Sequence, residues 1–261
     1  MDLRERPSTV TSRHPWETVR AGFFCRVLAD PLATGQPVRV VDVGAGDGFV
    51  GGKLLDSLPA GSSVTCVDSE YTADHIATLR EAAPSGLDFT RACPEREFDA
   101  IVLLDVLEHV ADDRGFLRSF VEQRLRPGGL LLASVPAHQA LYTQHDVALG
   151  HYRRYSAGEL RDLVVGAGLV PKVAGSLFGS LLVPRAIGKA LERVRGILSQ
   201  PSPDALAAQI STGVSAWQHG RVVTSAIRGA LEIDARLCEL AARWSAPSAG
   251  LSVWALCERA R

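Results

Sequence analysis

The chain has 261 residues, 28 basic against 29 acidic side chains, and a formal net charge of −1. This near neutrality argues against a general nucleic-acid-binding protein, and the length suits one large domain with a sizeable core. The hydrophobic share of 46% and the charged share of 22% are those of an ordinary globular protein.

The N-terminal sequence and the cysteines give no sign of export. The segment MDLRERPSTVTSRHPW lacks the apolar region of a signal peptide, and the uncharged apolar stretch 173–184 is too short to cross a bilayer. The 5 cysteines show no CxxC spacing, so neither a disulfide framework nor a zinc site is predicted. We expect a cytoplasmic protein in which Cys66 and Cys257 are small core residues within strands.

The first half of the chain alternates between helical and strand patterns. Residues 15–28 place apolar side chains at helical spacing and predict an amphipathic helix that ends at Pro31 and Gly35. The apolar run VRVVDV at 38–43 predicts a strand that is buried on both faces. Further strands are predicted at 63–67, 87–92, 100–104, 130–135 and 169–173, and helices at 49–58, 71–83, 112–125 and 156–167. This alternation predicts an α/β fold with a parallel sheet and helices on both faces.

The second half is mostly helical. The helical pattern runs from 177 to 246 with a break at 199–204, and a last strand is predicted at 251–256. The helices are apolar on one face and Arg-rich on the other, which fits a cap over an acceptor site, a homodimer interface, a contact with a membrane surface or a packed subdomain. The predicted parts are a tail and amphipathic helix at 1–36, an α/β core at 37–176, an inserted helical cap at 177–249 and a final core strand at 250–261.

A glycine-rich turn, Asp42-Val43-Gly44-Ala45-Gly46-Asp47-Gly48, follows the first strand directly. Glycines allow a tight bend and a close approach of the backbone to a ligand, and the following helix offers free N–H groups. The spacing from Gly46 formally matches the dinucleotide pattern of a dehydrogenase. In such a site, however, the first glycine closes the strand, and a count from Gly44 puts Phe49 where the third glycine is needed. A dinucleotide site is therefore disfavoured.

Two acidic residues stand at predicted strand ends. Asp68 follows the second strand, where a carboxylate can accept both hydroxyls of a ribose. The alternative for Asp68 is an N-cap for the helix that begins near Tyr71. Asp42, at the end of the first strand, either binds an amino group through water or holds the turn by hydrogen bonds.

Several segments together resemble a known family. VVDVGAGDG at 40–48, Asp68, FDAIVLLDVLEHV at 98–110 and LRPGGLLLASVPA at 125–137 are similar to the successive motifs of the class I S-adenosylmethionine-dependent methyltransferases. The resemblance implies a Rossmann-like, doubly wound sheet of seven strands in the order 3-2-1-4-5-7-6, with the last strand antiparallel and a helical insertion before it. It also implies S-adenosylmethionine as cofactor and S-adenosylhomocysteine as product.

The resemblance carries a set of cofactor contacts onto this chain. The glycines, including Gly48, would pack against the methionine and ribose portions, Asp68 would hold the ribose, and Asp105 would face the methyl-transfer centre. Arg91 and Ala92 fall where the family contacts adenine, although the usual Gly-Asp pair is absent there. The expected cofactor-binding residues are Asp42, Gly44, Ala45, Gly46, Asp68, Ser69, Arg91, Ala92, Asp105 and Val106.

The acceptor side is predicted from LDVLEHV and from a basic, aromatic loop at 138–155, which is similar to a segment of one methyltransferase subgroup. His109 is a general-base candidate or a packed histidine at a helix start. Arg153 and Arg154 either grip an anionic acceptor group or pair with acids of neighbouring helices. The catalytic candidates are Glu108, His109, His145 and Tyr155, and the substrate-binding candidates are His138, His151, Arg153 and Arg154.

No metal is predicted, because His138, His145 and His151 lack a helical i, i+4 spacing and a supporting group of acids. The prediction is a methyltransferase for a small molecule, a specialised metabolite of isoprenoid, lipid or polyketide type with an apolar body and an anionic group. The alternative is a methyltransferase-fold protein that serves as a non-methylating cyclase or a regulatory subunit. A nucleic-acid acceptor is disfavoured because no basic domain is appended.

Overall fold

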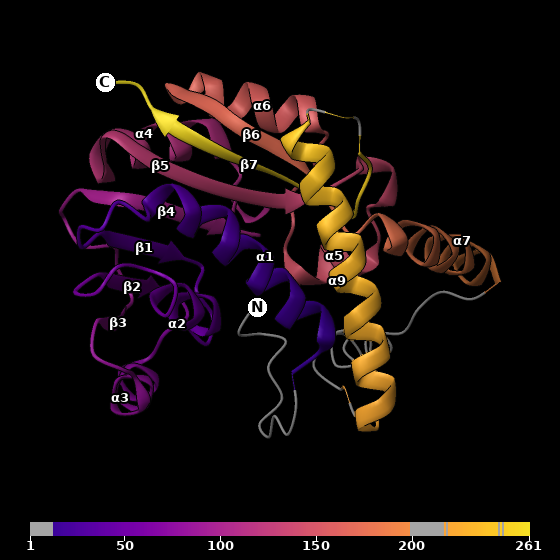
Figure 1. Ribbon diagram of the computed structural model, residues 1–261. Coiled ribbons are helices and arrows are strands. Elements are labelled where there is room, and N and C mark those ends of the chain that lie inside the picture. The colour runs from indigo at the N-terminus through magenta and orange to yellow at the C-terminus, as the bar shows by residue number, and fades with distance from the viewer. Residues whose placement is uncertain (1–12, 199–216, 218, 245, 247) are drawn as a thin grey trace.

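The computed structural model describes residues 13–198, 217, 219–244, 246 and 248–261. Its centre is a 7-stranded sheet in the order β3-β2-β1-β4-β5-β7-β6 (Figure 1). β7 is antiparallel to β5 and β6, whereas the pairs from β3 to β5 are parallel, which confirms the predicted fold class and strand order. The strands are β1 Arg39–Val43, β2 Ser63–Val67, β3 Leu87–Thr90, β4 Phe98–Leu104, β5 Leu125–Pro136, β6 Leu169–Leu177 and β7 Ser252–Arg259.

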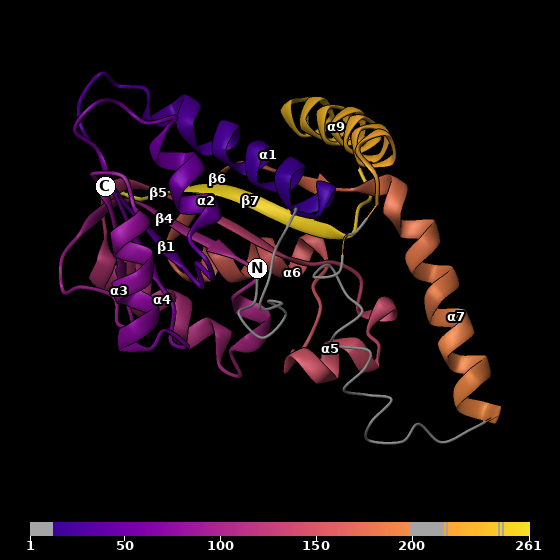
Figure 2. The same cartoon turned by 90° about the horizontal axis from the view of Figure 1, so that it is seen from below.

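Helices cover both faces of this sheet. Figure 2 shows α1 and α9 on one face and α4 and α6 on the other. The helices are α1 Pro15–Leu32, α2 Phe49–Leu55, α3 Ala73–Ala82, α4 Asp113–Arg124, α5 Gln144–Leu149, α6 Ala157–Gly166, α7 Leu182–Leu198 and α9 Arg221–Arg243. Short 3-10 turns are η2 Leu107–His109, η3 Gln139–Leu141 and η4 Gly179–Leu181.

The central strands β1 and β4 are buried on both faces of the sheet because they are continuous apolar runs, whereas the edge strands β3 and β6 are partly exposed. Val40 points into the core beneath α1, α2 and α9, and Val41 points into the core that contains Leu117 of α4. In the first of these cores, Phe23 of α1 meets Trp254 of β7 edge to face, with ring centroids 5.3 Å apart. Such aromatic pairs add to the stabilisation from buried area, so this contact fixes α1 on the sheet.

Some predicted boundaries differ from the observed ones. The prediction that Pro31 ends the first helix was wrong, since α1 continues through Pro31 to Leu32. β5 begins at Leu125, earlier than predicted, because Leu125 pairs with Phe98 of β4 before a register shift. The capping box predicted for the helix at 156–167 is confirmed in α6, where the side chains and backbone N–H groups of Ser156 and Glu159 bond reciprocally.

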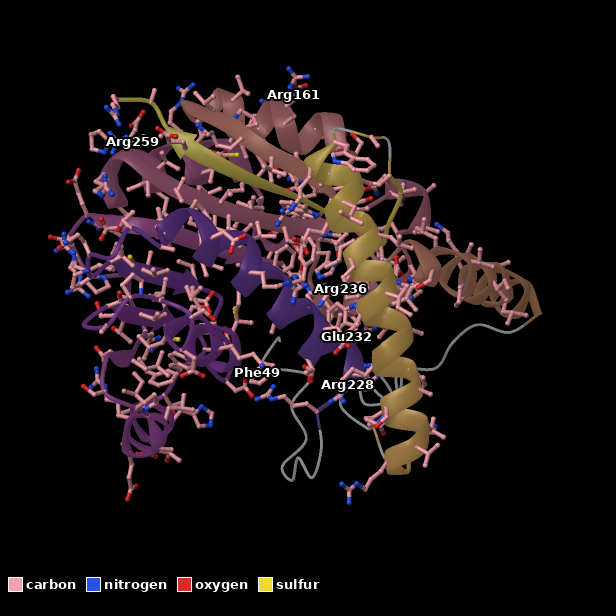
Figure 3. All side chains as sticks on the ribbon, viewed as in Figure 1. Phe49, Arg161, Arg228, Glu232, Arg236 and Arg259 are labelled. Carbon is pink, nitrogen blue, oxygen red and sulfur yellow. The ribbon has the colours of Figure 1, made fainter. Side chains whose placement is uncertain are left out.

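The inserted segment contributes two described helices. α9 packs along α1 and β6 through Leu231 and Ala235, while Arg228, Glu232 and Arg236 lie on its exposed face (Figure 3). α7 projects away from the body of the molecule (Figures 1 and 2). The predicted break at 199–204 lies outside the described residues, and the division into four parts stays a prediction.

Two further expectations concern the burial of two cysteines and the absence of a membrane-spanning helix. Cys66 and Cys257 are buried within β2 and β7, which confirms their prediction as core residues. Among the helices that the structure describes, none combines the length and the apolar character that a bilayer crossing requires.

We predict that Phe23→Ala lowers the free energy of unfolding by about 3–5 kcal/mol, because it leaves a cavity at the α1–β7 contact. Urea denaturation followed by circular dichroism measures this loss. Val165→Ala on the exposed side of α6 is the matched control and should change stability by less than about 0.5 kcal/mol. Equal effects of both substitutions would show that α1 does not depend on this aromatic contact.

Candidate functional site

The turn after β1 has a backbone that only glycine adopts without strain. Gly44, Gly46 and Gly48 have φ angles of +69°, +57° and +74°. A Cβ at Gly44 would lie 2.7 Å from Cγ2 of Val106, and one at Gly48 would lie 2.4 Å from Cε1 of Phe89. The turn therefore needs glycine both for its conformation and for the space beside it.

The tip of β2 holds this turn in place. The N–H groups of Gly44 and Ala45 donate to the carbonyl of Val67 at 2.8 and 3.1 Å. The N–H of Gly46 donates to Oδ2 of Asp68 at 3.0 Å. The glycine turn is thus tied to the next strand by backbone and side-chain hydrogen bonds together.

Asp68 does not cap α3, and both oxygens of its carboxylate accept hydrogen bonds from backbone N–H groups. Its Oδ1 accepts from the N–H of Glu70 at 3.0 Å, and the N-cap of α3 is Thr72 instead. Asp68 lines a large cavity beside the glycine turn. Because a carboxylate oxygen can accept more than one hydrogen bond, both oxygens of Asp68 keep capacity for ligand hydroxyls.

Asp42 lies behind the turn, in the interior. Its side chain is 2% exposed, and Oδ2 has no hydrogen-bond partner among the described residues. Burial raises the pKa of Asp42 to about 7, with a further rise from the neighbouring Asp68 that Arg20 opposes. Of the two hypotheses, contact with a ligand through water is the one that would satisfy Oδ2.

A cavity of about 780 Å³ opens over the carboxyl ends of β1, β2 and β4, within the usual range for a site that encloses a small molecule. Of the expected cofactor-binding residues, Asp42, Gly46 and Ala92 do not line it. Phe116 of α4, which the sequence analysis did not single out, does line it, and its ring stacks on Phe120. The expected residues that line the cavity are Gly44, Ala45, Asp68, Ser69, Arg91, Asp105 and Val106.

Asp105 follows β4 directly and lines this cavity. Its φ angle of 58° is uncommon for a residue with a side chain, and its N–H donates to the carbonyl of Ser134 at 2.9 Å. Arg20 of α1, 6% exposed, pairs with Oδ2 of Asp105 at 2.7 Å. Arg20 was not predicted, because nothing in the helical pattern of α1 shows that this arginine points inward.

Five of the eight predicted acceptor-side residues line the cavity and make up its polar wall: Glu108, His109, His145, His151 and Arg154. Glu108 is completely buried, and neither of its carboxylate oxygens has a hydrogen-bond partner among the described residues. Burial raises the pKa of Glu108 well above its ordinary value, and the nearby Asp105 adds to that rise. Burial also lowers the pKa of His145, with help from Arg185, so a neutral imidazole is favoured there.

Tyr155, His138 and Arg153 do not line the cavity. The hydroxyl of Tyr155 donates to Oδ2 of Asp113 at 2.8 Å, and burial with that carboxylate raises the pKa of the phenol. Arg153 pairs with the same Oδ2 at 3.1 Å, which matches the alternative in which it pairs with a helix acid. His138 is exposed at the start of η3.

Arg154 lines the cavity but is already paired. Its Nε and one terminal nitrogen donate to the two carboxylate oxygens of Asp146 at 2.8 and 3.2 Å. Asp146 is fully buried and also meets Nδ1 of His151 at 3.0 Å. Burial alone would raise the pKa of Asp146, but the hydrogen bonds from His151 and Arg154 outweigh it and hold the pKa well below its usual range.

The apolar part of the wall comes from segments far apart in the sequence. The contributing elements are the start of α1, α5 and the inserted helical segment. Sequence reasoning missed these residues individually, since only tertiary packing brings them together. They include Trp16, Leu149, Leu181, Ile227, Leu231 and Leu251.

Comparison with known protein families and sequences gives a consistent result. A family profile described as a methyltransferase domain matches residues 16–171. A probable S-adenosylmethionine-dependent methyltransferase of Mycobacterium tuberculosis is 27% identical over 191 residues, covering 68% of this chain and 67% of that protein. A ubiquinone biosynthesis O-methyltransferase of Methylocella silvestris is 33% identical over 107 residues, covering 38% of this chain and 40% of its own length.

Solved structures with the same fold are distant in sequence. An S-adenosylmethionine-dependent methyltransferase from Mesorhizobium loti superposes with a TM-score of 0.52 at 16% identity, covering 94% of this chain and 97% of its own. The [4+2]-cyclase SpnF superposes with a TM-score of 0.53 at 16% identity, covering 92% of this chain and 82% of its own. At these identities the similarity establishes the fold alone.

We predict that Asp146→Asn destabilises the protein by about 3–5 kcal/mol, because it leaves the buried guanidinium of Arg154 without its counter-charge. The measurement is the free energy of unfolding in urea. The control is Asp88→Asn, which breaks the exposed Arg80–Asp88 pair of 2.7 Å and should cost about 1 kcal/mol or less. Similar losses in both variants would contradict a central role for Asp146.

We predict that the ligand-free protein loses stability between about pH 4 and pH 7 through Asp42. The folded pKa of Asp42 is raised from 3.8 to about 7, so its contribution is fully present below the unfolded pKa and is lost as the pH rises through the folded one. In Asp42→Asn this part of the pH dependence should be missing. Unfolding free energies of both proteins across this interval test the prediction, and parallel curves would refute it.

Proposed function

The chain belongs to the class I S-adenosylmethionine-dependent methyltransferases, and from that premise we propose that it methylates a small molecule with an apolar body and an ionisable reacting end. The observation that carries the proposal is the single cavity that runs from the glycine turn to the apolar wall around Leu181 and Leu231. One end of the cavity suits the cofactor, and the other suits an acceptor.

The glycine turn fits the cofactor. A side chain at Gly44 would collide with Val106, so the backbone itself forms the surface there. Behind it, Oδ2 of Asp42 has no hydrogen-bond partner among the described residues and would accept from a water that also meets the cofactor's amino group. When bound, the cofactor supplies a sulfonium methyl group that is already electrophilic.

The chain then has mainly to orient the two reactants and to exclude water. Asp68 would hold the ribose, since its carboxylate lines the cavity while it accepts from Gly46. Asp105 would face the reacting end, held in place by Arg20. Phe116, which lines the same cavity as Val106, would offer an aromatic surface to the flat adenine.

The acceptor half supports a molecule of mixed character. Its apolar lining, with Trp16, Leu149 and Ile227 as examples, suits the body of an isoprenoid, lipid or polyketide. The relatives named for ubiquinone biosynthesis favour the isoprenoid type among these. The polar wall with His109 and His145 suits an ionisable group at the reacting end, where either imidazole could take up a proton.

Arg153 and Arg154 were candidates for binding an anionic group of the acceptor, and their ion pairs argue against that role. Arg154 is engaged by Asp146, and Arg153 lies outside the cavity with Asp113. We therefore assign both a supporting role for the loop 138–155, and we assign the ionisable end of the acceptor to the neighbourhood of Glu108 and His151.

The inserted segment 177–249 is proposed as a cap over the acceptor. Leu181, Arg185, Ile227 and Leu231 all contribute to the cavity wall. A wall from this segment would keep water from the reacting groups. Its contact with α1, rather than with the cofactor strands, is consistent with a role in acceptor choice.

The direct test is release of S-adenosylhomocysteine with a panel of acceptors. We expect turnover with apolar molecules that carry a hydroxyl or carboxyl group, and none with the matched ethers and esters that lack the acidic hydrogen. Binding of S-adenosylmethionine with no methyl transfer to any panel member would favour the alternative of a non-methylating protein. Turnover on transfer RNA would overturn the assignment of a small-molecule acceptor.

We predict that Asp68→Ala weakens S-adenosylmethionine binding by roughly 10–100-fold, since charge-assisted hydrogen bonds to the ribose are lost. Isothermal titration calorimetry measures the affinity. Asp68→Asn, which keeps an oxygen for the N–H of Gly46, should retain the fold and lose less affinity, and the exposed Asp74→Ala is the control. Undiminished binding by Asp68→Ala would remove Asp68 from the cofactor site.

A further inference from the structure

Three metal-ligating side chains meet on the acceptor side of the cavity. Glu108 and His109 belong to η2, and His151 comes from the loop that follows α5. The ligand atoms of the three all lie within 4.8 Å of one another. All three residues line the cavity, so the cluster faces the space proposed for the acceptor.

Glu108 is the buried member of the cluster, and its carboxyl group has no hydrogen-bond partner among the described residues. Its side chain is 0% exposed. A buried carboxylate in this state is strongly unfavourable unless a proton or a cation neutralises it. The cavity is the side from which such a cation could reach it.

His151 is oriented as metal-binding histidines are. Its Nδ1 lies 3.0 Å from Oδ1 of Asp146, which leaves Nε2 for another partner. A carboxylate on the far nitrogen fixes the ring and raises the basicity of the ligating one, and this arrangement is usual behind metal ligands. The ring of His109 stands edge to face with that of His151, with centroids 4.6 Å apart.

We propose that Glu108, His109 and His151 bind one divalent transition-metal ion, whose open coordination position takes the ionisable oxygen of the acceptor. Two imidazoles favour an ion such as Zn²⁺ over Mg²⁺ or Ca²⁺, and three protein ligands leave a position open. Bond lengths of about 2.0–2.2 Å place ligand atoms roughly 3–3.5 Å apart around such an ion. Small side-chain rotations close the cluster to that size.

This set differs from the three histidines weighed in the sequence. His138 is exposed and does not line the cavity, and the acid that the earlier set lacked is Glu108, about thirty residues before the loop 138–155. A bound ion would polarise an acceptor hydroxyl and lower its pKa. This consequence rests on the proposed methyl transfer, whereas ion binding itself does not.

The test titrates Zn²⁺ and, as a spectroscopic probe, Co²⁺ into the full chain after treatment with EDTA. We expect one equivalent to bind, with visible d–d absorption for Co²⁺, and we expect His151→Ala and Glu108→Gln to weaken binding at least 100-fold. His75→Ala, an exposed histidine on α3, is the matched control and should bind as the wild type does. Affinities from calorimetry and from the Co²⁺ spectrum should agree.

Folding is checked by circular dichroism and by the affinity for S-adenosylmethionine. Glu108→Gln removes a buried charge without removing bulk, so it keeps the test meaningful where His151→Ala does not fold. Folded wild type that binds neither ion, or folded Glu108→Gln with unchanged affinity and spectrum, overturns the proposal. Loss of binding in folded Glu108→Gln but not in His75→Ala supports it.

Activity separates this proposal from the proposed function. With an acceptor from the panel, EDTA should abolish turnover and Zn²⁺ should restore it in the wild type. Turnover that persists after complete removal of metal refutes the catalytic part of the proposal and leaves methyl transfer intact. Metal binding without methyl transfer to any acceptor refutes the proposed function and leaves the ion site intact.

Discussion

The bend after β1 depends on hydrogen bonds that its N–H groups donate to the tip of β2. The N–H groups of Gly44 and Gly46 are directed to the carbonyl of Val67 and the carboxylate of Asp68. Left-handed backbone at Gly44, Gly46 and Gly48 is costly by itself, so these bonds set the shape of the turn before any ligand arrives. The same carboxylate then faces the cavity, which couples the position of a bound sugar to the geometry of the turn.

On the acceptor side, Asp146 holds the surrounding segments in place by its hydrogen bonds. It accepts hydrogen bonds from Thr143, Arg154 and His151, and Arg185 lies 3.4 Å away. The loop between β5 and α6, the short helix α5 and the start of the inserted segment are therefore held by one carboxylate. Arg154, which the sequence suggested as a substrate-binding residue, pairs with Asp146 instead. The loop residue that lines the cavity with a fixed orientation is His151, whose ring is held by Asp146.

The sequence predicted the sheet because its information is local. A buried strand such as β1 is a continuous apolar run, and the residue after it stands at the carboxyl edge in any parallel sheet. The cofactor half of the site could be predicted for this reason. The acceptor half could not, because the partner of a charged side chain is chosen by tertiary packing: nothing local shows that Arg20 meets Asp105 or that Arg153 turns outward to Asp113.

Glu108 and Asp146 are both buried carboxyl groups, yet their pKa values shift in opposite directions. Both carboxylates are completely buried. Around Asp146 the chain supplies the positive charge itself, and the pKa of that carboxyl falls. Around Glu108 the described residues donate no hydrogen bond to either carboxylate oxygen, and burial raises the pKa. A carboxylate that the fold leaves uncompensated, on the wall of a cavity and beside two imidazoles, gains stability only from a proton or from a cation that enters through that cavity. The protein's own side chains thus neutralise the charge of Asp146, whereas at Glu108 that role is left to a proton or to a bound cation.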